Sequence, residues 1–200
     1  MAIIETKTKE SIIKNGYLLE TLSRERIWDE IKKSFSQSKD FNEYLKYILD
    51  FKLSQYIFPG VKINTDLVDS KDFVVIFTNL FKLEDTKVLE SKLVQEFKIE
   101  TEVAKKIIFL LEFSKMKVED VFDLYKKKVA SGISDSTILE WLKVTGNESN
   151  TLIKFIDYKP TVSAQELMDR GIKGKELGLE IKRLEVEKFK EMLWKNLQIK

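Results

Sequence analysis

The sequence predicts an all-α protein, an elongated array of many helices, and three observations support this fold class. Hydrophobic residues make up 43% of the 200 positions and charged residues 34%, whereas only 2 residues are proline and 7 are glycine. Apolar residues recur at spacings of three and four along most of the chain, which is the helical period. The glycines fall almost entirely between these periodic stretches, so they indicate helix ends.

The first third of the chain predicts helices with recognisable starts and stops. Thr8 is expected to cap a short helix that ends near Gly16. Ser23 precedes a second amphipathic helix as its N-cap. Asp40 can cap a third helix, which should end near Ile57 because the residue before a proline is pushed out of the helical region. Residues 60–70 then form a polar connector.

Residues 73–83 form an apolar, β-branched run that could be either a buried strand or a buried helix. No partner strand is evident and the neighbouring stretches have helical periods, so the run is predicted to be a buried helix. The helices expected after it cover residues 83–97, 100–113, 117–129, 134–144 and 147–156. A long amphipathic helix should follow the turn at residues 171–175 and reach the end of the chain.

Composition excludes several kinds of chemistry. The chain has no cysteine and no histidine, which excludes disulfides, zinc sites, cysteine nucleophiles and histidine acid–base catalysis. No apolar run is long enough to cross a bilayer, and the N-terminus lacks a secretory signal. We therefore expect no membrane partner, no metal site and a cytoplasmic protein, with mitochondrial or nuclear locations open for a eukaryotic one.

Three basic features are candidate RNA contacts, although the net charge is only +2. The turn with Lys173, Gly174 and Lys175 precedes a helix whose free N–H groups favour anions, so it could grip a phosphate. Residues 171–200 hold eight basic and five acidic side chains, Lys182 and Arg183 among them. Lys126, Lys127 and Lys128 form a further cluster. The alternatives are a plain glycine turn with solubilising lysines and a solvated helix face.

Two motifs resemble those of class II tRNA nucleotidyltransferases, the CCA-adding enzymes and their poly(A) polymerase relatives. Ser23, Glu25, Arg26 and Glu30 reproduce the Ser-x-Glu-Arg-x-x-x-Glu motif of the family's neck. Near the C-terminus, the matching positions are Leu167, Met168, Gly171, Lys173, Gly174 and Gly178. A glycine common upstream in the family is Ala164 here, and the prolines of bacterial versions of the turn are Lys173 and Lys175.

The resemblance implies a neck at residues 1–60, a helical body at 61–158 and a tail at 159–200. It implies that Arg26 and Glu30 have a structural role, as an ion pair that braces two helices. The body and tail would hold tRNA by its backbone phosphates, measuring shape more than sequence. The 3′ end would then reach a catalytic head on another segment or on a separate subunit.

The family's catalytic carboxylates are absent, because the chain has no Asp-x-Asp pair and no glycine-rich loop before a strand. The 200 residues alone are therefore predicted to be inactive and to need no cofactor, with Mg²⁺ and ATP or CTP belonging to the head. The chain could be a fragment, a split subunit or a degenerate paralogue. Two other functions stay open, a helical protein-interaction scaffold and the RNA-binding part of a poly(A) polymerase.

Overall fold

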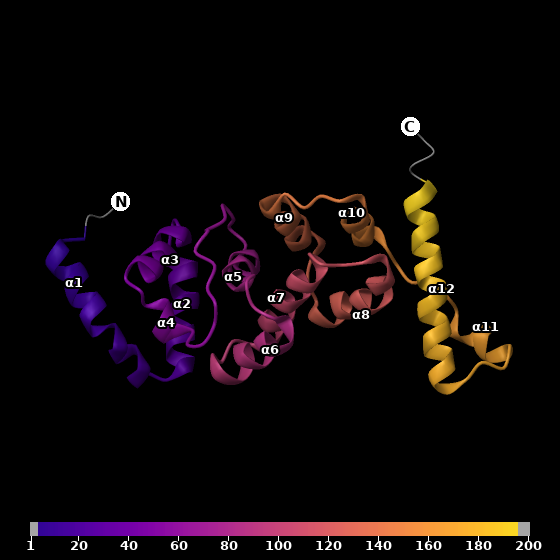
Figure 1. Cartoon of the computed structure of the whole chain (residues 1–200), viewed down its shortest axis with the longest axis horizontal. Coiled ribbons are helices and arrows are strands. Elements are labelled where there is room, and N and C mark those ends of the chain that lie inside the picture. Colours follow the sequence, from indigo (N-terminus) through magenta and orange to yellow (C-terminus); the bar gives the residue numbers. More distant parts are fainter. Residues whose placement is uncertain (1–3, 196–200) are drawn as a thin grey trace. The chain divides into compact units, whose positions relative to one another are not determined.

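The protein is all-α, as predicted, in a computed structural model that describes residues 4–195 (Figure 1). Every regular element among these residues is helical. The chain divides into two compact units, Met1–Ile108 and Phe109–Lys200, and the division falls within α7 (Thr101–Phe113). The division into neck, body and tail rests on the resemblance and stays a prediction.

The first unit starts with helices whose N-caps were largely predicted from the sequence. The Ser23 hydroxyl accepts a hydrogen bond from the Arg26 N–H, and the Asp40 carboxylate caps the third helix. The Thr8 prediction is wrong, because α1 already begins at Thr6 and Thr8 lies inside its first turn. In chain order, the elements are α1 (Thr6–Asn15), the 3-10 helix η1 (Gly16–Thr21), α2 (Arg24–Gln37), α3 (Phe41–Asp50), α4 (Ser54–Ile57), α5 (Phe73–Phe81), α6 (Thr86–Ser91) and the π-helix η2 (Lys92–Glu96).

The apolar run in the middle of this unit is the buried helix α5, as predicted. The Asp72 carboxylate accepts hydrogen bonds from the N–H groups of Val74 and Val75, which starts a helix in a sequence with strand-like composition. Phe77 and Phe81 are completely buried. Seven consecutive residues, from Val75 to Phe81, are buried on all sides of the helix, so α5 is the centre of the core of this unit.

The single helix expected over residues 40–57 is broken in two. Lys52 has a φ of 59°, and the N–H groups of Lys52 and Leu53 bond back to Leu49 and Ile48. These paired bonds end α3 in a Schellman motif. No glycine or proline marks the break, and a lysine there carries the cost of a left-handed backbone. The turn lets Phe51 be buried together with Ile57 of α4.

The helix expected over residues 83–97 starts later and changes its winding. It begins at Thr86 as α6 and continues from Lys92 as a π-helix, with the Phe97 N–H bonded to the Lys92 carbonyl at 2.9 Å. Leu89, Leu93 and Phe97 are all buried, so the wider turn keeps them on one side. Lys98 follows with a φ of 59°.

The second unit is assembled around a chain of aromatic rings. Phe113 lies 5.7 Å from Phe109 and 5.4 Å from Phe155, while Tyr158 meets Phe189 of the last helix at 5.4 Å. The last helix packs on α8 and on the 3-10 helix before it. The elements of this unit are the end of α7, η3 (Val118–Asp120), α8 (Val121–Ser131), α9 (Asp135–Thr145), α10 (Asn150–Asp157), α11 (Ala164–Asp169) and α12 (Gly174–Lys195).

Candidate nucleic-acid interface

The turn before α12 is shaped by two glycines with left-handed backbone angles. Gly171 has a φ of 89° and Gly174 a φ of 59°, values that residues with a Cβ atom adopt only at a cost. The N–H groups of Gly171 and Ile172 bond to the carbonyls of Met168 and Leu167 at 2.9 and 3.1 Å. These bonds end α11 in a Schellman motif, and the chain then turns into α12 within a few residues.

Lys173 and Lys175 stand on either side of Gly174, and both side chains are exposed. Within residues 4–195, neither ammonium group has a hydrogen bond or an ion pair. The first N–H groups of an α-helix have no partner inside the helix and carry partial positive charge. The turn therefore offers two uncommitted cations beside the positive end of a helix of 22 residues.

A buried carboxylate fixes the segment before α11 to α12. Glu185 is completely buried and accepts hydrogen bonds from the Tyr158 hydroxyl at 2.7 Å and from the Thr161 and Val162 N–H groups at 2.6 and 2.5 Å. Burial and the Glu185 carboxylate both raise the pKa of Tyr158 well above its ordinary value. Because these bonds hold the segment before α11 against α12, they also fix the position of the glycine turn relative to α12.

Two predicted RNA contacts from distant parts of the sequence meet at one carboxylate. Asp123 accepts from the Lys182 ammonium at 2.6 Å and pairs with Lys126 at 3.0 Å. The Lys182 ammonium, followed by Lys126, holds the pKa of Asp123 below its ordinary value, and Asp123 in turn raises the pKa of Lys182. Lys126 also lies over the Phe122 ring. The three charges leave a net +1, so this cluster attracts anions less than its lysines suggest.

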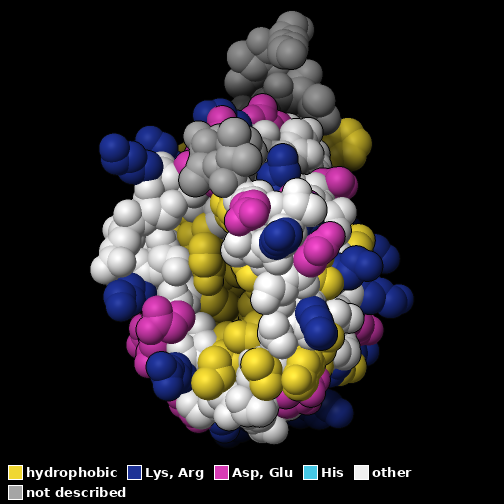
Figure 2. Space-filling model, turned by 90° about the vertical axis from the view of Figure 1, so that its left-hand side faces the viewer, with side chains coloured by type: hydrophobic (Ala, Val, Ile, Leu, Met, Phe, Trp, Pro, Cys, Tyr) yellow, Lys and Arg dark blue, Asp and Glu magenta, His cyan; other side chains and the backbone are white. Residues whose placement is uncertain are grey.

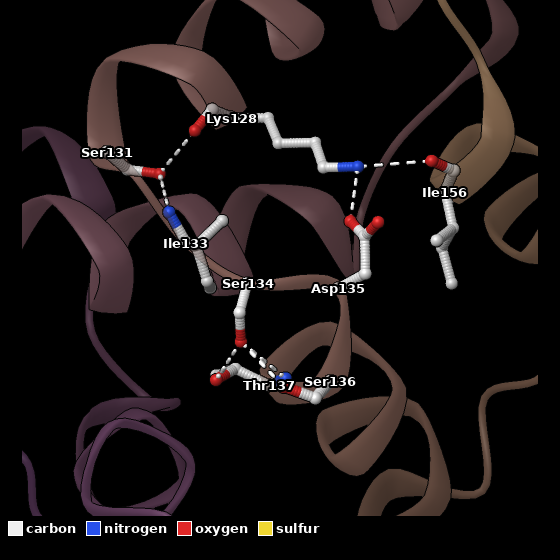
Figure 3. A network of polar contacts seen from close by, with 8 residues as sticks. All are labelled: Lys128, Ser131, Ile133, Ser134, Asp135, Ser136, Thr137 and Ile156. Carbon is white, nitrogen blue, oxygen red and sulfur yellow. Dashed lines mark hydrogen bonds and ion pairs between the residues drawn. The ribbon is translucent and has the colours of Figure 1, made fainter.

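The other two lysines of the predicted cluster are tied to neighbouring elements. Lys127 pairs with Glu112 at 2.7 Å. Lys128 pairs with Asp135 at 2.6 Å and donates to the Ile156 carbonyl at 3.1 Å (Figure 3). The Lys128 side chain is only 14% exposed, whereas those of Lys126 and Lys127 are more than half exposed. Lys128 thus connects α8 to the start of α9 and the end of α10. An RNA contact would have to compete with these internal contacts.

Arg183 is also engaged within its own helix. Its guanidinium pairs with Glu180 at 2.7 Å and with Glu187 at 2.5 Å, spacings that form readily on one helix face. Among the seven basic residues predicted to contact RNA, Lys173 and Lys175 are the pair without an internal partner in the described part of the chain. They are therefore the first candidates for phosphate contacts.

The neck motif is placed differently from the expectation. Ser23 is the N-cap of α2 and Glu25 lies in its first turn. The expected ion pair is not formed. Arg26 and Glu30 are both exposed, and neither pairs with a charged group among residues 4–195. Water solvates both groups at that exposure, which removes the need for a partner. Instead, both side chains line a groove beside α2, and Figure 2 shows a hollow with a hydrophobic floor on this side of the molecule.

The bracing role belongs to residues that the sequence did not single out. Arg24 donates from Nη1 to the carbonyls of Tyr56 and Ile57, at 2.7 and 3.2 Å, where α4 ends. A cation at the C-terminal end of a helix is favourable, but the contact joins residues more than thirty positions apart. No local pattern reveals such a partner.

Glu100 holds the other side of α2. Its carboxylate accepts from the Trp28 indole N–H at 2.6 Å and from the Lys32 ammonium. Partial burial acts to raise the pKa of Glu100, but Lys32 and Trp28 outweigh it and hold the pKa below the ordinary value. The charged and indole groups next to the motif are therefore structural.

Among the described residues, no group of three or more acidic side chains could hold a metal ion. In the same part of the chain, no helix is long and apolar enough to cross a membrane.

Comparison with protein families finds a match within the first unit. Residues 3–64 match the family model described as the probable RNA and SrmB-binding site of polymerase A. Searches of curated proteins and of solved structures found no match. The matched range covers α1 to α4 and includes the Ser23–Glu30 motif and its groove. Residues 3–64 are therefore similar to the RNA-binding site of polymerase A, and this similarity supports RNA binding by the first unit.

Proposed function

We propose that this chain holds tRNA as the non-catalytic, C-terminal portion of a CCA-adding tRNA nucleotidyltransferase. The observation that carries the RNA part of this proposal is the family match over residues 3–64. The tRNA part is supported by the Gly171–Lys175 turn, whose sequence resembles the C-terminal signature of those enzymes. Its two uncommitted lysines at the start of a long helix fit a phosphate contact.

The chain grips its RNA through the backbone. Lys173 and Lys175 contact phosphates of the acceptor and elbow region, while Lys126 and Lys182 add a weaker field because they share Asp123. Such contacts position an RNA without reading its sequence. The protein therefore recognises the shape of its tRNA, and the 3′ end is left free for reaction elsewhere.

The chemistry is supplied by another segment or another chain. Transfer of a nucleotide to a 3′ hydroxyl requires metal-bound carboxylates, and the 200 residues contain no Asp-x-Asp pair. Mg²⁺ and ATP or CTP belong to that catalytic head. The role of this chain is to hold the tRNA so that its 3′ end reaches the head.

The contact at the turn is tested by replacing both lysines, Lys173→Ala with Lys175→Ala. Affinity for tRNA lacking its CCA end is measured by fluorescence anisotropy over a salt series. Each lost phosphate contact removes roughly 0.7–0.9 from the slope of log affinity against log salt, so the slope should become shallower by about 1.5. Arginines at both positions should keep most of the binding, since they carry the same charge.

The matched control is Lys87→Ala with Lys143→Ala, which changes the net charge equally at two exposed lysines of α6 and α9. This control should retain the native slope. Equal losses in the two double variants would mean that only overall charge matters, and an unchanged affinity in the Lys173 and Lys175 variant would remove the turn from the interface.

The name of the matched family favours a second candidate, the RNA-binding part of a poly(A) polymerase. The two candidates differ in their RNA. A CCA-adding enzyme prefers a folded tRNA, whereas a poly(A) polymerase part accepts a single-stranded 3′ end. Competition between tRNA and an oligoadenylate of equal charge separates them, with the stronger competitor identifying the function.

A further inference from the structure

The middle of α12 differs from its start, because its lysines are paired with carboxylates. Lys182 pairs with Asp123 at 2.6 Å, and the Lys190 ammonium lies 3.7 Å from Glu119. Asp123 and, more weakly, Asp120 raise the pKa of Lys182. The three acidic residues come from η3 and the start of α8, the elements on which α12 packs. One short acidic stretch therefore faces two lysines that lie roughly 12 Å apart along the helix.

Asp123 is the centre of this acidic stretch, because each of its carboxylate oxygens contacts a different lysine. Oδ2 accepts a hydrogen bond from the Lys182 ammonium at 2.6 Å, and Oδ1 lies 3.0 Å from the Lys126 ammonium. A phosphate group presents its oxygens to lysines in the same way. The carboxylate therefore takes the place between α8 and α12 that an RNA phosphate would otherwise occupy.

These ion pairs are accessible to RNA, but replacing them is unfavourable. The side chains of Asp123, Lys126 and Lys182 are 48%, 58% and 40% exposed, and ion pairs at such exposure are weak. A phosphate that displaces the carboxylate leaves Asp123 beside it as an unpaired anion, and like charges in contact repel. A phosphate contact here therefore carries an electrostatic cost that a contact with Lys173 or Lys175 does not.

We infer that Asp123 is a specificity-determining residue, which lowers the affinity for RNA that does not engage the turn at Lys173 and Lys175. This inference rests on the proposed RNA function. Non-specific binding of nucleic acids comes from phosphate contacts at any available cation. Because Asp123 neutralises part of the charge on α8 and α12, an unstructured RNA gains little there. An RNA that fits the turn keeps its main contacts, so the difference between the two affinities increases.

Asp123→Asn tests the inference, because it removes the charge and keeps the shape of the side chain. Affinities of the whole chain for tRNA lacking its CCA end and for an oligouridylate of equal length are measured by anisotropy over a salt series. The oligouridylate should bind about three- to tenfold more tightly to the variant, and its slope of log affinity against log salt should steepen by about 0.7 for each lysine released. The tRNA should gain less than about twofold, because the turn already positions it.

Two further variants locate the effect. Asp157→Asn makes the same charge change at an exposed aspartate of α10, and it should leave both the slope and the preference for tRNA close to those of the native chain. Adding Lys126→Ala and Lys182→Ala to Asp123→Asn should abolish the gain in oligouridylate affinity, since the released lysines are then missing. Urea denaturation verifies that each variant is folded under the conditions of the binding assay.

Three results would overturn the inference in a native chain that prefers tRNA. Equal oligouridylate affinities of Asp123→Asn and Asp157→Asn would show that Asp123 does not restrain RNA binding. Equal gains for the two RNAs would show that it sets affinity without selecting between them. A gain that persists without Lys126 and Lys182 would have another origin. The proposed function fails in a different way, because absent RNA binding by the native chain and by every variant would overturn both proposals.

Discussion

Single residues decide the geometry of the turn before α12, and two glycines close in sequence show how. Gly174 and Gly178 both face open space, so neither position would clash with a Cβ atom. They differ in backbone conformation, because Gly174 has a φ of 59° whereas Gly178 lies within α12 without a positive φ. The same substitution should therefore have opposite effects at the two positions.

Gly178→Ala should raise the free energy of unfolding of the second unit by about 0.5–1 kcal/mol, since alanine costs less backbone entropy in a helix. Gly174→Ala should lower it by about 1 kcal/mol or more, because alanine enters the left-handed region unfavourably. Urea denaturation measures both. Two changes of the same sign would contradict the backbone angles of this turn.

The charge on Asp123 gives the second unit a pH dependence of known sign. Its pKa is lowered in the folded protein by Lys182 and Lys126, so the stabilisation is present above its ordinary pKa of 3.8 and is lost as the pH falls through the lower, folded value. With Asp123→Asn, the free energy of unfolding should fall less steeply as the pH drops below about 4. Denaturation over an acid pH series measures the slope.

Asp157→Asn is the matched control, at an exposed aspartate of α10 that has no ion pair among the described residues. With Asp157→Asn, the slope of the free energy of unfolding against pH below pH 4 should stay close to that of the native protein. If Asp123→Asn left the slope unchanged as well, the contact between α8 and α12 would not contribute to stability.

Among the helices, α2 is held by contacts that local sequence does not reveal. Arg24 and Arg26 lie two positions apart, yet Arg24 reaches the end of α4 while Arg26 lines the groove. The two arginines therefore provide a matched test of the bracing role, which the sequence motif assigns to Arg26 and the structure to Arg24.

Arg24→Met should lower the free energy of unfolding of the first unit by about 1–2 kcal/mol, since it leaves two carbonyls at the end of α4 without their charged donor. Arg26→Met should change it by no more than about 0.5 kcal/mol. Hydrogen exchange in α2 and α4 reports the loss locally. A larger effect at Arg26 would restore the motif's bracing role.

Helix starts were predictable because their signals are local. Ser23 and Asp40 cap the helices that follow them, as predicted, and each needs only a side-chain oxygen two or three residues from a free N–H. The break at Lys52 and the π-helix from Lys92 have no such signal. They arise from packing in the folded unit, which overrides local propensity.

Taken over the whole chain, the sequence was sufficient for the fold class and for the location of the basic turn. It could not show which cations are already paired, because Asp123, Glu112 and Asp135 reach Lys182, Lys127 and Lys128 through tertiary contacts. Charge counted along the sequence therefore overstated the basic surface. The uncommitted pair at Lys173 and Lys175 became distinguishable from the other lysines only in the folded unit.

The proposed recognition of tRNA by its shape concerns the whole chain, and one measurement tests it. The affinity of the 200-residue protein for tRNA lacking its CCA end is compared, over a salt series, with its affinity for an acceptor minihelix. We predict salt-dependent binding that prefers the full tRNA, because contacts reach beyond the acceptor stem. Equal affinity for the two RNAs, or no binding at moderate salt, would contradict the proposal that this chain holds tRNA.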